Sequence, residues 1–100
     1  MRLSKFEIES IKSMADRHFG AGVQVFLYGS RTSDQKRGGD IDLLISNQDG
    51  EHLSTQKKID FLTDLILLIG EQKIDVVLDN KHTKQTLFLK SIFQKGIQLC

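Results

Sequence analysis

Hydrophobic residues recur at helical spacing in three stretches of the chain. The first begins beside Ser4 and Glu7, which match a capping box, and it predicts a helix over residues 5–18. The second predicts a helix over residues 54–69, because its apolar side chains lie three and four positions apart and a glycine follows them. The third predicts a helix over residues 83–95.

Three runs rich in β-branched and aliphatic residues predict strands at residues 23–28, 40–45 and 74–78. The alternating tail at residues 97–99 is a candidate for pairing at a sheet edge. Helices that separate strands favour an α+β (layered α/β) fold, with helices packed on a three-stranded sheet. The helix between the second and third strands predicts that these two strands run parallel.

Three aspartates lie where such strands are normally apolar. Asp40 and Asp42 open the second strand, and Asp75 lies early in the third. Side chains two positions apart in a strand share a face, so Asp40 and Asp42 project to one side. If the second and third strands are parallel, all three carboxylates gather at one end of the sheet. Like charges so close are unfavourable unless a cation neutralises them.

Oxygen ligands without a neighbouring Cys or His favour a hard cation, Mg²⁺ or Mn²⁺, over zinc. Solvated turn residues are the simpler explanation for any one acid. For Asp40, Asp42 and Asp75 together, a metal site explains the pattern better.

The chain leaves the first predicted strand through Gly29 and Ser30. A residue without Cβ lets the backbone approach a phosphate closely, and the following hydroxyl and amides can bind an anion. Arg31, Lys36 and Arg37 add positive charge to the same loop. The segment is neither a P-loop nor an EF-hand, because the Lys and Glu that those motifs need are missing.

Composition excludes several classes of function. Fourteen basic and thirteen acidic residues give a net charge of +1, so neither membrane attachment nor stable nucleic-acid binding by overall charge is expected. Cys100 is the one cysteine, which excludes a disulfide scaffold. The longest apolar run is far shorter than the ~20 residues that span a bilayer, and no signal peptide is apparent, so we expect a cytoplasmic protein.

Gly29-Ser30-Arg31, followed by Gly39-Asp40-Ile41-Asp42-Leu43 and a later acid, resembles the signature of the DNA polymerase β-like nucleotidyltransferase superfamily. The short chain is similar to its minimal nucleotidyltransferases (MNT), which are often encoded beside a HEPN-domain protein. The resemblance implies one minimal nucleotidyltransferase domain over residues 1–100. It also implies a three-stranded mixed sheet in order 1-2-3, with the first strand antiparallel to the second.

By the same resemblance, Gly29, Ser30 and Arg31 hold a nucleoside triphosphate. Asp40, Asp42 and Asp75 are the catalytic and metal-binding residues, and Asp75 assists activation of the attacking hydroxyl. One departure concerns the basic residues: many minimal members continue Gly-Ser-Arg with x-Arg-Gly, whereas here Thr32-Ser33-Asp34 follows. The contribution of Arg31, Lys36 and Arg37 to phosphate binding is therefore left open.

The resemblance implies Mg²⁺-dependent transfer of a nucleoside monophosphate from a nucleoside triphosphate to a hydroxyl acceptor. We expect the triphosphate to be ATP and the transferred group AMP, with another nucleoside triphosphate as the alternative. An acceptor on a HEPN partner would make the chain the antitoxin of a toxin–antitoxin pair. A non-catalytic antitoxin that acts by complex formation is the alternative, although no acid is replaced. A third alternative is an aminoglycoside-type small-molecule transferase, against which the absence of a second domain counts.

The last predicted helix carries an apolar arc wider than one packed face needs. We expect part of this arc to contact a partner protein or another subunit of a homo-oligomer. Core packing remains the simpler explanation of each individual member of the arc. The members are Leu87, Phe88, Leu89, Ile92 and Phe93.

Overall fold

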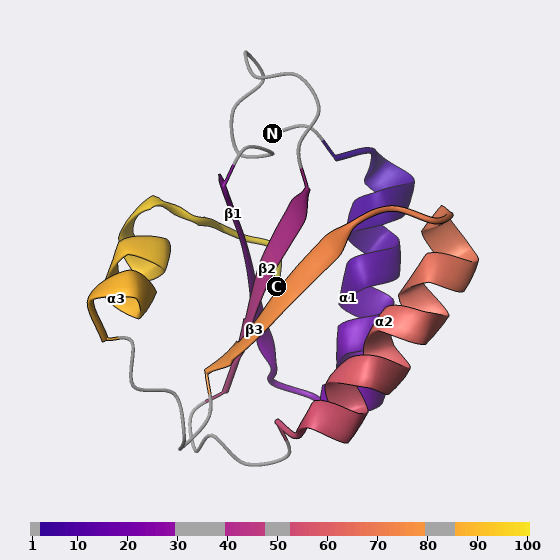
Figure 1. Ribbon diagram of the computed structural model, residues 1–100, viewed down its shortest axis with the longest axis horizontal. Helices are drawn as coiled ribbons and strands as arrows, with labels where there is room; N and C mark the ends of the chain where they lie inside the picture. The colour runs from indigo at the N-terminus through magenta and orange to yellow at the C-terminus, as the bar shows by residue number, and fades with distance from the viewer. Residues whose placement is uncertain (1–2, 30–39, 48–52, 80–85) are drawn as a thin grey trace.

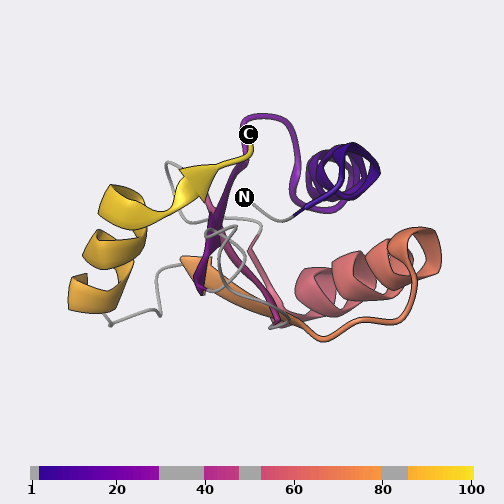
Figure 2. The same ribbon diagram turned by 90° about the horizontal axis from the view of Figure 1, so that it is seen from above.

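A mixed β-sheet separates two helices on one face from a third helix on the other (Figures 1 and 2). The computed structural model describes residues 3–29, 40–47, 53–79 and 86–100. The elements in chain order are α1 (Lys5–Phe19), β1 (Gln24–Tyr28), β2 (Ile41–Ser46), α2 (Thr55–Ile69), β3 (Ile74–Asp79), α3 (Thr86–Lys95) and β4 (Ile97–Gln98). The predicted α+β class is confirmed, and residues 83–85 of the third predicted helix lie outside the described residues.

The sheet has four strands in the order β3-β2-β1-β4. The predicted order 1-2-3 is confirmed for its first three strands, with β1 antiparallel and β3 parallel to β2. The expectation of three strands was wrong, because β4 pairs antiparallel with β1. The Leu99 amide donates to the Val25 carbonyl at 2.7 Å, and the Val25 amide donates to the Cys100 carbonyl at 3.1 Å. The tail therefore satisfies backbone groups that an edge strand would leave unpaired.

The ends of α1 and α2 follow from local side-chain chemistry. Ser4 and Glu7 form the predicted capping box, each accepting a hydrogen bond from the other's backbone amide. Ser54 accepts from the Lys57 amide at the start of α2. Both helices end at glycines with positive φ, Gly20 and Gly70, a conformation that a side chain disfavours. These capping residues define where the two long helices begin and end, and they can be recognised in the sequence.

The two faces of the sheet carry cores of unequal size. Beneath α1 and α2, a large cluster of buried side chains joins the helices to residues of β1, β2 and β3. A contact between helices accompanies it, in which His18 Nε2 of α1 lies 2.7 Å from Asp64 Oδ2 of α2. Under α3 the buried cluster is small: Phe26, Leu44, Leu89 and Ile92. In the described part of the chain, each helix is too short or too polar to cross a bilayer.

Candidate active site

Three carboxylates meet at one end of the sheet, on the face that carries α3. Asp42 lies opposite Asp75 in the parallel register of β2 and β3, and Asp40 precedes β2 by one residue. One carboxylate oxygen from each of the three lies within 4.8 Å of the other two. The predicted gathering of these acids is therefore confirmed. This gathering depends on the parallel connection through α2, which brings the starts of β2 and β3 to the same end of the sheet.

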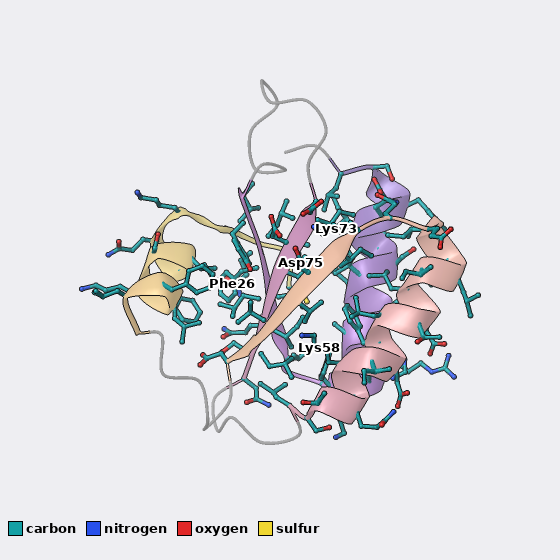
Figure 3. All side chains as sticks on the ribbon, viewed as in Figure 1. Phe26, Lys58, Lys73 and Asp75 are labelled. Carbon is teal, nitrogen blue, oxygen red and sulfur yellow. The ribbon has the colours of Figure 1, made fainter. Side chains whose placement is uncertain are left out.

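Burial and neighbouring negative charge both act on Asp42. Burial raises the pKa of Asp42 above its ordinary value, and the charges of Asp75 and Asp40 raise it further. Lys73 lowers the pKa of Asp42, and its Nζ lies 3.4 Å from Asp40 Oδ2. Figure 3 shows Lys73 and Asp75 together at the start of β3. Because the Lys73 side chain is 73% exposed, this ion pair offsets little of the repulsion.

Gly29 brings the backbone at the end of β1 against the Asp42 carboxylate. Its φ is +79°, and a Cβ built there would lie 3.3 Å from Asp42 Cγ and closer still to Oδ2. A residue with a side chain would therefore be strained and would displace the carboxylate. The glycine predicted to allow close approach of a phosphate also allows close approach of this acid.

Tyr28 extends the row of acids onto the next strand. It lies opposite Asp42 in the antiparallel register of β1 and β2, so Tyr28, Asp42 and Asp75 occupy neighbouring positions across three strands. Burial raises the pKa of the Tyr28 hydroxyl, and the charges of Asp42 and Asp75 raise it further. The Tyr28 ring also makes an edge-on contact with Phe88 of α3, with ring centroids 5.6 Å apart. This contact connects the acidic cluster to α3.

The donor set matches a hard divalent cation. Three carboxylates supply only oxygen ligands, and Mg²⁺ is usually bound by one or two carboxylates together with substrate phosphates. The partial exposure of Asp40 and Asp42 and the exposure of Asp75 leave room for such a substrate. The charge balance agrees with this fit, because a cation would relieve the repulsion that raises the pKa of Asp42.

The site residues expected in the loop after β1 are described only in part. Gly29 is placed beside Asp42. Ser30 and Arg31 lie outside the described residues, as do Lys36 and Arg37.

Comparison with known families assigns the chain. The family described as "Polymerase beta, Nucleotidyltransferase" matches residues 9–100. The chain belongs to the polymerase β nucleotidyltransferases. A search among curated proteins gave no match.

Membership of the polymerase β nucleotidyltransferases confirms the resemblance expected from the Gly-Ser and Asp-x-Asp motifs. It implies a nucleoside triphosphate substrate, a transferase activity and, as is typical of the family, a divalent metal ion.

Two residues of this nucleotidyltransferase were missed by sequence reasoning. Tyr28 was read only as the end of a strand, and Lys73 was not considered. The signal for Lys73 was its place two residues before Asp75, because residues two apart in an extended chain project to the same side. For Tyr28 the only signal was its position next to Gly29.

Proposed function

We propose that this chain is an active, Mg²⁺- or Mn²⁺-dependent nucleotidyltransferase that transfers AMP from ATP to a hydroxyl acceptor. In this proposal Asp40, Asp42 and Asp75 are the catalytic and metal-binding residues. Gly29, Ser30 and Arg31 bind the nucleotide, and residues 1–100 act as one minimal nucleotidyltransferase domain.

One observation carries the proposal. In a chain of this family, three aspartates from two strands bring their oxygens within 4.8 Å of one another and remain accessible to a substrate. In the part of the chain that the structure describes, the ion pair with the exposed Lys73 side chain offsets little of the repulsion among them. The cluster is therefore better suited to binding a ligand than to stabilising the fold.

The reaction is an in-line displacement at the α-phosphorus. The acceptor oxygen forms a bond to phosphorus, the bond from phosphorus to the bridging oxygen of the β-phosphate breaks, and pyrophosphate leaves. A bound divalent cation supplies neutralisation of the charge on the phosphates. Asp75, the most exposed of the three acids, accepts the proton of the attacking hydroxyl. Catalysis otherwise consists of positioning and electrostatic stabilisation.

Label transfer tests this proposal. The chain is incubated with Mg²⁺, ATP labelled at the α-phosphate, and the protein encoded by the adjacent gene. We expect label on that protein, and we expect its loss when the chain carries Asp40→Asn and Asp42→Asn. Label that persists in the double variant would exclude the acidic cluster as the catalytic site.

The acceptor that we propose is a hydroxyl on a HEPN-domain partner, which would make the chain an antitoxin. A non-catalytic antitoxin is the second candidate, and exposed apolar side chains on α3 favour it. Leu87, Phe88 and Phe93 are exposed there, which suits contact with another protein.

Binding measurements on the same proteins separate the two candidates. Tight complex formation by both wild type and the double variant, with no label transferred by either, would favour inhibition by complex formation. Transfer that requires the acids would favour the enzyme.

A further inference from the structure

A pocket of about 260 Å³ opens between the end of β1 and α3. Its walls include Tyr28 and Gly29 from β1, and Phe88, Ser91, Ile92 and Lys95 from α3. Neither the family match nor the roles proposed for the three aspartates assigns a function to this pocket.

The pocket and the acidic cluster share a wall. Tyr28 lies opposite Asp42 in the register of β1 and β2, and the Gly29 backbone lies directly against the Asp42 carboxylate. Both features lie on the α3 face of the sheet, as does Phe26, which Figure 3 labels on the side of α3. A ligand whose phosphates reach the acids can therefore place its remaining part in the pocket.

The lining suits the nucleoside part of a nucleotide better than its phosphates. The rings of Tyr28 and Phe88 offer surfaces against which a flat base can pack, and Ser91 offers a hydroxyl group. Ser91, Ile92 and Lys95 lie in the C-terminal half of α3, where the carbonyl end of the helix disfavours an anion, and the charge of Lys95 is the lining feature that favours one. The volume lies just below the ~300–1,000 Å³ typical of drug-sized ligands, which is appropriate for a fragment of a nucleotide.

We propose that this pocket binds the base and ribose of the substrate nucleotide. The inference rests on the proposed nucleotidyltransferase function and extends it. Phe88 and Tyr28 pack against the base, while the triphosphate lies toward the acidic cluster.

Two phenylalanines of α3 provide a matched pair of variants. Phe88 and Phe93 are 39% and 44% exposed, and each makes an edge-on contact with an aromatic residue of β1. Phe88 lines the pocket, whereas Phe93 packs on Phe26 away from it. Phe88→Ala therefore removes a pocket wall, and Phe93→Ala controls for loss of an aromatic side chain from the same helix.

The measurement is calorimetric titration of each protein with ATP and, separately, with inorganic tripolyphosphate, both in excess Mg²⁺. We expect Phe88→Ala to weaken ATP binding roughly tenfold and Phe93→Ala by less than twofold, because stacking contributes ~1–3 kcal/mol per base. Both variants should bind tripolyphosphate like the wild type. Ser91→Phe, which fills the pocket without removing a wall, should weaken ATP binding in the same selective way.

The outcomes separate this inference from the proposed function. Equal ATP affinity in the wild type, Phe88→Ala and Ser91→Phe would overturn the nucleoside pocket, and the acceptor would become its better occupant. Parallel loss of ATP and tripolyphosphate binding would also overturn it, because the pocket would then hold phosphates. Failure of the wild-type protein to bind either ligand would overturn the proposed function and the pocket with it.

Discussion

Asp42 is partly buried and lies near both Asp75 and Asp40, and this environment leads to a prediction about stability. Its pKa is raised in the folded protein, so the fold disfavours the charged carboxylate. We expect Asp42→Asn to raise the melting temperature of the metal-free protein at pH 7 by a few degrees, since ~1 kcal/mol corresponds to roughly 4–8 °C in a domain of this size. Thermal unfolding followed by circular dichroism measures the difference.

The sign of the pH dependence follows from the raised pKa. The wild type loses stability relative to Asp42→Asn as pH rises from the ordinary aspartate value through the raised one, and below this window the two proteins should converge. Asp60→Asn, an exposed substitution on α2, serves as the control and should leave the melting temperature within about 1 °C. Adding Mg²⁺ should stabilise the wild type and not Asp42→Asn. A large loss of stability in Asp42→Asn would instead identify Asp42 as a structural residue.

The positive φ of Gly29 and its close contact with Asp42 predict that a side chain there destabilises the fold. Gly29→Ala should lower the free energy of unfolding by roughly 2–5 kcal/mol, because left-handed backbone strain adds to overlap with the Asp42 carboxylate. Gly22 has a similar φ of +86°, but a Cβ there would meet nothing within 4 Å. Gly22→Ala should therefore lower that free energy by only ~1–2 kcal/mol. Equal losses in chemical denaturation would show that the contact with Asp42 contributes nothing.

The three aspartates were predictable because alternation along a strand and a parallel crossover are both readable from sequence. Tyr28 was not, since its position opposite Asp42 depends on the register between β1 and β2. No turn motif in the long connection between these strands specifies that register. Lys73 lies outside any motif, and its contact with Asp40 depends on where β3 begins.

Among the elements, α1 and α2 matched their predicted ends closely, because Ser4, Ser54 and the terminal glycines cap them. β4 was anticipated only as a tail that alternates. Two residues provide too little periodicity to define a strand, and the free edge of β1 that they cover exists only once the sheet has formed.

The backbone hydrogen bonds between the C-terminal tail and β1 can be tested by substitution at Leu99. Leu99→Pro removes the amide that donates to the Val25 carbonyl at 2.7 Å, whereas Leu99→Ala retains it. We expect the proline variant to be less stable than the alanine variant by about 1–3 kcal/mol in urea denaturation. Equal stability of the two variants would mean that side-chain packing, and not the hydrogen bond, holds the tail against β1.

For the molecule as a whole, the unequal cores predict unequal local stability. Among the described residues, the buried cluster under α3 is small, while α1 and α2 share a much larger one. Under native conditions, backbone amides of α3 should exchange with solvent faster than those of α1 and α2, through an opening that leaves the larger core intact. Hydrogen exchange followed by NMR measures this order. Equally slow exchange in all three helices would contradict it.

The shared register of Asp42 and Asp75 has a consequence for how the sheet aligns. If β3 slipped by one residue along β2, Asp75 would turn toward the apolar face beneath α1 and α2, and Ile74 and Val76 would turn away from it. A carboxylate among those buried aliphatic side chains is strongly unfavourable. Asp75, which we propose as a catalytic residue, therefore also favours the correct register of β2 and β3, because a one-residue slip would bury its carboxylate. A chain that gathers its three carboxylates has, by that fact, assembled β2 and β3 correctly.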